Sequence, residues 1–381
     1  MTDARQPWQR GVAILTAIYI TRMLGLFMIF PVFSLYANEL AGANKTLVGI
    51  ALGIYGLSQG LLQIPCGWLS DRYGRKPVIA GGLALFVAGS LLAACASDIY
   101  MMIAARAVQG MGAIAAVALA YATDITPPDK LGKTMTILGA SIGIAFVLSL
   151  ILGPLLAGWV GVAGLFLIIA LMAAAALVAG LRLPDATYPV TRRDEYQRKP
   201  IYQAAATIFT LHAIFTATFL VLPSLLVAGG IDKAYHWWLY LPANLIALAF
   251  MRRKNAPHPL SFGVNFLILA AGAALLAVPV AHTAWLLTAL TVYFIAFYRL
   301  ETGLPHWVAQ NAAPDSRGKA MGIYSSAQFI GSFTGGAIGG RIWQNQSPAT
   351  ILITLAIASA IAALLLLKTG KTATLRGAQQ P

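Results

Sequence analysis

Four charged side chains lie deep inside long apolar runs of this sequence: Arg22, Arg106, Arg299 and Glu301. A charge in hydrocarbon is costly, so it nearly always faces a cavity or a partner. Glu301 is the only carboxylate among the four. Burial disfavours its ionised form and a nearby arginine favours it, and this competition suits a group that binds and releases a proton. The pattern leaves two roles open for Glu301: a proton carrier, or a structural partner of an arginine.

Two further residues accompany Glu301 as candidate proton-coupling residues, Arg106 and His306. Pro305 can interrupt the helix beside Glu301, and His306 could relay a proton or only line the wall. His212 lies in another apolar run, where we expect a satisfied polar residue rather than a ligand. No spacing of His, Cys, Asp or Glu predicts a metal site.

Polar and aromatic residues in the apolar runs predict a binding site for a small amphipathic molecule. The candidates are Arg22, Phe27, Phe30, Tyr55, Gln59, Gln63, Arg299, Tyr324 and Gln328. Three deep arginines against one glutamate leave a surplus of positive charge, which should repel a lipophilic cation. Either neutral acceptors satisfy the arginines, or the bound molecule is neutral or anionic.

The elements that carry these residues are apolar enough to cross a bilayer. Hydrophobic residues make up 59% of the chain, charged residues 10%, and the mean hydropathy is +0.76. A span needs roughly 20 apolar residues, and such runs satisfy their backbone in lipid as helices. We predict an all-α integral membrane protein with about twelve transmembrane helices. They lie near residues 12–36, 46–69, 77–96, 99–122, 134–160, 162–182, 201–228, 237–251, 260–280, 284–312, 319–344 and 347–367.

Positive charge sets the expected orientation of these helices. The net charge is +14, and most of the 26 Lys and Arg residues fall in the two tails and in alternate loops. Basic loops lie on the cytoplasmic side of a membrane protein, so we expect both termini there. The charge therefore reflects topology, and no basic stripe with stacking aromatics predicts nucleic-acid binding.

Two stretches of the chain repeat one another at about half its length. Residues 128–137 read Pro-Asp-Lys-Leu-Gly-Lys-Thr-Met-Thr-Ile, and residues 314–323, 186 positions later (314 − 128), read Pro-Asp-Ser-Arg-Gly-Lys-Ala-Met-Gly-Ile. Parallel repeats of six spans are a known transporter plan. We expect two pseudo-symmetric six-helix bundles, at residues 1–182 and 201–368. A cytoplasmic linker at 183–200 would join them, and a short cytoplasmic tail at 369–381 would follow.

A charged, glycine-containing loop separates the second and third expected spans. Residues 67–76 read Gly-Trp-Leu-Ser-Asp-Arg-Tyr-Gly-Arg-Lys. A lone acid among three bases indicates a charge network, and glycine permits a sharp turn. Asp124, at the end of the fourth span, is the natural partner for Arg75. The residues of this expected network are Gly67, Asp71, Arg72, Gly74, Arg75, Lys76 and Asp124.

This loop closely resembles the one between the second and third spans of major facilitator superfamily transporters. The run Arg106-Ala-Val-Gln-Gly-Met-Gly resembles a second element of that family. The fifth span resembles an element associated with the family's antiporter branch, although Ala157 replaces one of its paired glycines. Small residues there allow close helix packing. The matching residues are Gly139, Gly143, Gly153, Pro154 and Gly158.

Residues 22–32 and 299–331 are similar to the YajR-type subgroup, which is placed among the drug:proton antiporters. This resemblance implies proton-coupled export of small amphipathic molecules by rocking of two halves in a bacterial inner membrane. It implies that Asp71, Arg75 and Asp124 latch the cytoplasmic side against the start of the eleventh span, and that the fifth-span element occludes the path. The subgroup's namesake has a C-terminal soluble domain, for which we expect too few residues after the last span.

Other functions stay open at this stage. A uniporter or symporter for a sugar or organic anion would use the arginines to hold its cargo. A membrane sensor could keep the fold without transport. We expect no enzyme, because no nucleophile–base pair or phosphate-binding loop is present. We expect no cofactor, with a proton gradient as the energy source, and a monomer whose partners are a small molecule, protons and the bilayer.

Overall fold

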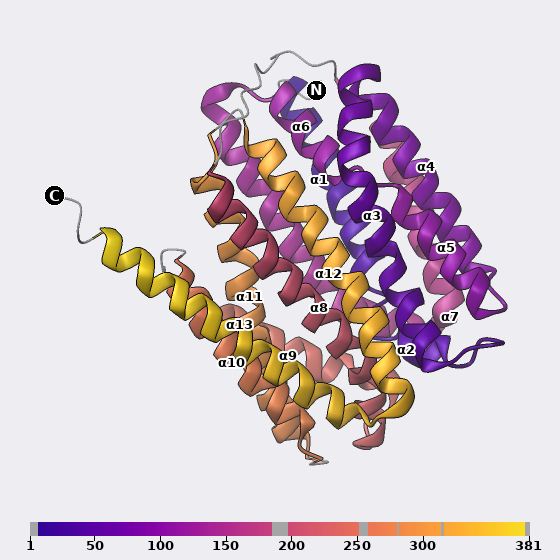
Figure 1. Cartoon of the computed structure of the whole chain (residues 1–381). Helices are drawn as coiled ribbons and strands as arrows, with labels where there is room; N and C mark the ends of the chain where they lie inside the picture. The colour runs from indigo at the N-terminus through magenta and orange to yellow at the C-terminus, as the bar shows by residue number, and fades with distance from the viewer. Residues whose placement is uncertain (1–6, 185–196, 251–257, 280–281, 314–315, 378–381) are drawn as a thin grey trace.

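The computed structural model describes residues 7–184, 197–250, 258–279, 282–313 and 316–377, and it is a bundle of helices (Figure 1). The elements are α1 (Pro7–Phe27), α2 (Phe33–Ala37), α3 (Lys45–Tyr73), α4 (Arg75–Ala94), α5 (Ile99–Met111), α6 (Ala115–Ile125), η1 (Pro128–Lys130), α7 (Leu131–Gly180), α8 (Arg198–Ala228), η2 (Lys233–Tyr235), α9 (Trp237–Ala249), α10 (Pro259–Ala277), α11 (Thr283–Gln310), α12 (Arg317–Asn345) and α13 (Pro348–Gly377).

Each of the expected spans has a helical counterpart. In the described part of the chain, nine helical segments are long and apolar enough to cross a membrane. One of them, α7, has 50 residues and contains Gly161 at φ 69° and ψ 174°, so it consists of two helices that cover the fifth and sixth expected spans. The eighth and eleventh spans correspond to α9, with 13 residues, and α12, with 29. The prediction of an all-helical multi-span protein is confirmed.

Three boundaries differ from those predicted. The first expected span is interrupted, because α1 ends at Phe27, turns follow, and α2 begins at Phe33. Pro31 lies in this interruption and has no N–H to continue a helix. The fourth span is divided into α5 and α6 near Gly112, where the backbone comes so close to α4 that an added Cβ would overlap the Gly82 carbonyl oxygen. The last helix continues to Gly377, into the stretch expected as a tail.

The helices form two groups, one from each half of the chain, which meet mainly where α3 packs on α12. In Figure 1 the indigo to magenta helices of the first half, α1 to α7, lie beside the red to yellow helices of the second half, α8 to α13. Within the first half α1 and α4 pack on α7, and within the second half α10 packs on α11 and α13. The main contact between the halves joins α3 to α12. Residues 185–196 of the expected linker lie outside the described residues.

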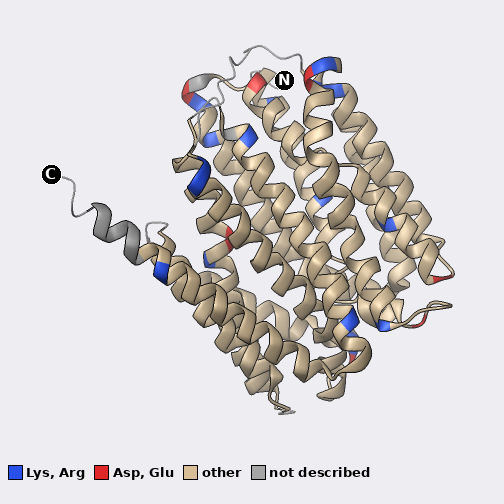
Figure 2. Cartoon of the chain, in the orientation of Figure 1, with Lys and Arg blue, Asp and Glu red and all other residues tan. Residues whose placement is uncertain are grey.

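The two ends of the bundle differ in charge. The end where the chain begins, called the basic end here, holds the end of α3, the start of α4, η1 and the start of α7, which carry Arg72, Arg75, Lys76, Lys130 and Lys133. Basic residues are visible there in Figure 2, beside the N label. The other end, called the opposite end, holds the turns that precede α3, α5 and α9. The alternation of basic and less basic turns therefore matches that expected for successive membrane crossings.

The two halves are packed tightly from the opposite end as far as Gly60, near the middle of α3, where an added Cβ would lie 2.8 Å from the Ile330 side chain. A Cβ added at Gly49 of α3 would overlap the Gly336 carbonyl oxygen of α12, and one added at Gly53 would lie 2.8 Å from the Phe333 Cα. Toward the basic end of α12, a Cβ added at Gly318 or Gly322 would meet nothing within 4 Å. The halves therefore diverge from their contact toward the basic end.

Candidate functional site

The carboxylate of Glu301 lies in a polar cluster built from three helices of the second half. Its Oε2 is 3.0 Å from Nε2 of His212 on α8, and its Oε1 accepts a hydrogen bond of 3.0 Å from Gln328 on α12. Ser332 on α12 lies 3.4 Å from the other ring nitrogen of His212. The Glu301 side chain is 24% exposed and that of His212 is 5% exposed. The cluster therefore holds a partly accessible acid against an almost fully buried imidazole.

Arg299 and His306 do not join this cluster in the structure. Residues two positions apart on a helix face different directions, and Arg299 donates instead to the Phe250 carbonyl oxygen at 3.4 Å. His306 lies on an exposed face, where its Nε2 is 3.1 Å from Gln310. The partner found for Glu301 is His212, which sequence reasoning treated only as a satisfied polar residue. The sequence signal that could have identified His212 is a lone histidine in an apolar run.

A second polar cluster surrounds Arg22 in the first half. Its guanidinium donates to Gln59 Oε1 at 2.8 Å and to the Tyr55 hydroxyl at 3.2 Å, both on α3. It also lies 5.7 Å from the centre of the Phe86 ring on α4. Arg22 is buried, with 3% of its surface exposed. Its recorded partners are all neutral, so its charge is solvated by dipoles rather than balanced by an acid.

Arg106 is fully buried behind Tyr55. Its guanidinium lies 5.0 Å from the centre of the Tyr55 ring and donates to Gln109 on the same helix. Gln109 in turn donates to Ser90 of α4 at 2.8 Å. These contacts lie in the first half, whereas Glu301 lies in the second. The structure therefore brings Arg106 to Tyr55 and not to the Glu301 cluster with which the sequence grouped it.

Several buried polar atoms near the contact of α3 and α12 have no hydrogen-bond partner in the described structure. Gln63 of α3 lacks a partner for either amide atom, although the residue is only 1% exposed. The hydroxyls of Tyr324 and Ser326 on α12 are orphaned in the same way. A Cβ added at Gly60, one turn from Gln63, would lie 3.1 Å from the Ser326 carbonyl oxygen. Unpaired buried polar groups are costly, so this region has unused binding capacity.

Aromatic rings from both halves pack on the opposite-end side of these clusters. Phe27 lies 4.8 Å from Phe146, Phe30 lies 5.2 Å from Phe215, and Phe215 lies 4.8 Å from Phe297, all between ring centres. Phe215 is one turn beyond His212 along α8. The rings therefore separate the polar clusters from the opposite end. Phe27 and Phe30 were expected near the site, whereas the other three were missed because they are ordinary core residues in a single sequence.

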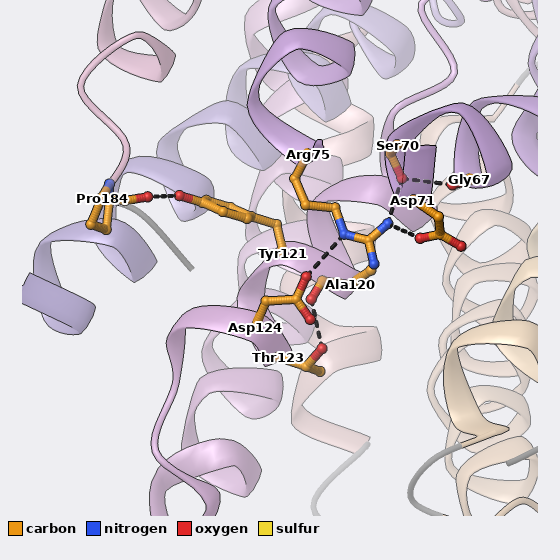
Figure 3. A network of polar contacts seen from close by, with 9 residues as sticks. All are labelled: Gly67, Ser70, Asp71, Arg75, Ala120, Tyr121, Thr123, Asp124 and Pro184. Atoms are coloured by element: carbon orange, nitrogen blue, oxygen red, sulfur yellow. Dashed lines mark hydrogen bonds and ion pairs between the residues drawn. The ribbon is translucent and has the colours of Figure 1, made fainter. Parts of the chain in front are cut away.

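The charge network at the basic end is present and is centred on Arg75 (Figure 3). Arg75 Nε donates to Asp124 Oδ2 at 2.9 Å, and Nη1 contacts Asp71 and Ser70. The side chains of Arg75 and Asp124 are 10% and 15% exposed, and that of Asp71 is 38% exposed. These contacts join the end of α3, the start of α4 and the end of α6, which all belong to the first half.

The rest of the predicted loop motif surrounds this network. Gly74 has φ 93°, a conformation that favours glycine, and it separates α3 from α4. Arg72 lies 5.7 Å from the Trp68 ring centre and 5.5 Å from the Tyr73 ring centre. Lys76 follows in the first turn of α4, and a Cβ added at Gly67 would meet nothing within 4 Å.

The fifth-span element packs at only part of its length. A Cβ at Gly153 would overlap the Met28 carbonyl oxygen, so α7 touches the interruption between α1 and α2 there. Pro154 is buried beside it, and Gly158 lies near Ala234 of η2. Cβ atoms at Gly139 and Gly143 would meet nothing within 4 Å. The element therefore follows the same gradient as α12, packed toward the opposite end and free toward the basic end.

Among the described residues, no group of three or more His, Cys, Asp or Glu side chains could hold a metal ion.

Comparisons with known proteins agree on one family. The model of the Major Facilitator Superfamily matches residues 15–336. The chain is 36% identical over 362 residues to the inner membrane transport protein YajR of Escherichia coli strain K12, covering 89% of this chain and 78% of that protein. The solved structure of the human organic anion transporter MFSD10 (TETRAN) superposes with a TM-score of 0.73 at 16% identity, covering 95% of this chain and all (100%) of that one. The solved structure of the POT family transporter PepTSo gives a TM-score of 0.74 at 10% identity, covering 97% of this chain and 99% of that one. At these identities the two structures show the fold alone.

Proposed function

The chain belongs to the Major Facilitator Superfamily and is a multi-pass membrane transporter, and we propose that it exports small amphipathic molecules in exchange for protons. The observation that carries this proposal is the cluster of Glu301, His212 and Gln328. Its acid, on α11, is partly exposed, and its partners come from two other helices, α8 and α12. No nucleotide-binding loop supplies another source of energy in the sequence.

The chemistry of the cluster suits a proton exchange. Ionised Glu301 accepts hydrogen bonds from Gln328 and, in the appropriate tautomer or when protonated, from His212. Protonation of the carboxylate removes its charge and weakens both contacts. Because the three residues lie on α8, α11 and α12, a change in their contacts alters how those helices pack. Proton binding can thereby bias one arrangement of the two halves over another.

The packing gradient supports alternating access between the two sides of the membrane. The basic end would face the cytoplasm by the positive-inside bias, with both termini there, in a bacterial inner membrane. The units that rock would be residues 1–182 and 201–368 of a monomer. The structure has the halves in contact toward the opposite end and apart toward the basic end. Rocking about the site would reverse this arrangement.

The Arg75 network would act as the cytoplasmic latch. Its ion pairs hold the loop between α3 and α4 in a fixed shape against α6. When the basic end closes, this loop would meet the start of α12. An energy of ~1–3 kcal/mol would bias the access equilibrium without freezing it. The Gly153 contact with the α1–α2 interruption would help to occlude the path from the other side.

Proton flux into proteoliposomes tests the proposal. The purified full chain would be reconstituted with an internal pH dye, an imposed proton gradient, and a panel of lipophilic cations, neutral antibiotics, sugars and organic anions. We expect cargo-dependent proton movement that is lost in Glu301→Gln and kept in Glu39→Gln, a matched change at an exposed carboxylate. The direction of proton movement separates export from symport. Flux that survives Glu301→Gln would remove that residue from the mechanism, and binding without flux would favour a sensor.

A further inference from the structure

We propose that the cargo site recognises a small organic anion, with its charged group held by Arg22 and by the side-chain amides of Gln59 and Gln63. The inference rests on the proposed transport function and adds the chemical class of its cargo. It does not depend on whether the cargo is exported or imported. It follows from the charge, the unpaired donors and the position of the first-half cluster.

The charges in the first half lack a counter-ion. In the part of the chain that the structure describes, the charged side chains buried within α1 to α7 are Arg22 and Arg106, and both are cations. Their recorded partners are the neutral residues Tyr55, Gln59 and Gln109. The acid of the second half is already paired with His212. Buried charges are normally paired, so a negative group is the partner that the first half lacks.

Two of the unpaired hydrogen-bond donors lie along one face of α3, and the third belongs to Arg22 of α1. Tyr55, Gln59 and Gln63 follow one another at intervals of four residues, which places them on the same side of the helix. Nε2 of Gln59, Nε2 of Gln63 and Nε of Arg22 are buried without hydrogen-bond partners. The two side-chain amides, together with the Nε–H of the Arg22 guanidinium, are donors that a carboxylate or similar oxyanion accepts from.

The position of this face also fits a ligand that enters from the basic end. Along α3, Gln63 is the nearest of the three to the basic end, and Gly60 beside it marks the region where α3 reaches Ser326 of α12. The orphaned hydroxyls of Tyr324 and Ser326 lie on that helix. A ligand between Gln63 and these hydroxyls would touch both halves.

Apolar groups border the same region, so the anion would carry a hydrophobic part. The Tyr55 ring centre lies 6.5 Å from that of Phe329 on α12 and 6.3 Å from that of Phe86 on α4. A lipophilic cation would place its charge beside Arg22, where like charges repel. The cluster therefore discriminates by sign and selects an amphipathic anion over an amphipathic cation of the same size.

Ligand binding to the purified full chain in nanodiscs tests this inference without transport. The probes are benzoate, 2-naphthoate and decanoate, each compared with its neutral primary amide and with the corresponding primary ammonium. Affinity is measured by calorimetry and by the shift in unfolding temperature. We expect at least one carboxylate to bind about tenfold or more tightly than its amide, because hydrogen bonds to charged groups are the stronger ones, and the ammonium not to bind.

Variants of Arg22 and Gln63 test whether these residues cause the preference for a carboxylate. Arg22→Gln should lower carboxylate affinity about tenfold or more, while Arg341→Gln, at an exposed arginine near the opposite end of α12, should leave it unchanged. Gln63→Leu provides a second test if Arg22→Gln does not fold. Gln63 makes no hydrogen bond in the structure, so this change should keep or raise the unfolding temperature and still weaken carboxylate binding. A purely structural role for Gln63 would leave affinity unchanged.

The outcomes separate this inference from the proposed proton coupling. Equal binding of carboxylate, amide and ammonium, preference for an ammonium, or no binding by any carboxylate would overturn the anion site. Carboxylate binding that Gln63→Leu and Arg22→Gln leave intact would also overturn it. Carboxylate binding that depends on both residues but never moves protons through Glu301 would uphold the anion site and refute the proton coupling.

Discussion

The two ends of the bundle are held together by different means. At the opposite end the halves meet backbone to backbone, through glycines of α3 and α12 such as Gly49 and Gly336. At the basic end the same helix α12 begins with Gly318 and Gly322, whose Cβ positions are free. At that end Arg75 forms ion pairs with Asp71 and Asp124, and all three residues belong to the first half. At the closed end the contacts therefore join the two halves, whereas at the open end the contacts of Arg75 lie within the first half.

This difference allows the molecule to change state without losing its fold. Glycine-to-glycine packing depends on close approach and is lost as soon as the halves separate. Ion pairs inside one half move with that half and persist through a rigid-body motion. The opposite end is thereby suited to open and close, while the Arg75 network keeps the first half intact during the motion.

Covalent closure of the opposite end should stop transport. The Lys45 backbone N–H donates to Gln344 Oε1 at 2.9 Å across the two halves. In a background with Cys66→Ser and Cys95→Ser, the pair Lys45→Cys and Gln344→Cys should be bridged by a short cross-linker that forms reducible disulfides with both thiols, such as a bis-methanethiosulfonate. We expect cargo flux in proteoliposomes to fall to the empty-vesicle level and to return after reduction. The single variant Lys45→Cys with the same reagent is the control, and full flux after complete cross-linking would contradict this mechanism.

A single added carbon should disturb the closed end. In Gly336→Ala the new Cβ would overlap the Gly49 carbonyl oxygen and lie 3.2 Å from the Gly53 Cα. Overpacking against backbone costs about 3 kcal/mol, so the unfolding midpoint in detergent should fall. The halves should also separate more readily, and a thiol placed at Gln344 should become more reactive from that side. An unchanged midpoint with unchanged reactivity would mean that the glycines do not hold the halves together.

The Arg75 network should give graded losses of stability. Arg75→Gln leaves Asp71 and Asp124 close together without their cation, and we expect a loss of about 2 kcal/mol in unfolding free energy. Asp124→Asn should cost less, because Asp71 still pairs with Arg75. Asp71→Asn should cost under ~1 kcal/mol, since Asp71 is 38% exposed. Unfolding in mixed micelles measures the series, and equal losses at the two acids would refute the ranking by burial.

Much of the fold follows from the sequence, because long apolar runs admit only helices in lipid. This reasoning did not predict the interruption of the first span after Phe27. Pro31 marked the site, but hydropathy alone continued the span to residue 36. The pairing of Arg75 with Asp124 was expected from a charged motif and is present. Its role as a latch stays a prediction.

The partners of Glu301 could not be read from the sequence. His212 and Glu301 are separated by 89 positions, and which faces of α8 and α11 meet depends on the packing of the whole half. Arg299, only two positions from Glu301, looked closer in sequence but faces another way on the helix. Residue type singled out the acid in the sequence, whereas its environment required the arrangement of three helices.

Gly322→Ala is the matched change at the open end and should have the smallest effect on stability. Its Cβ would meet nothing within 4 Å, and alanine favours a helix over glycine by about 0.5–1 kcal/mol. The unfolding midpoint should therefore stay the same or rise, in contrast to Gly336→Ala measured in the same detergent. If the basic end closes during the cycle, the start of α12 becomes a contact surface, so this variant should transport more slowly at full stability. A fall in its unfolding midpoint equal to that of Gly336→Ala would show that both ends are packed alike and would refute the comparison.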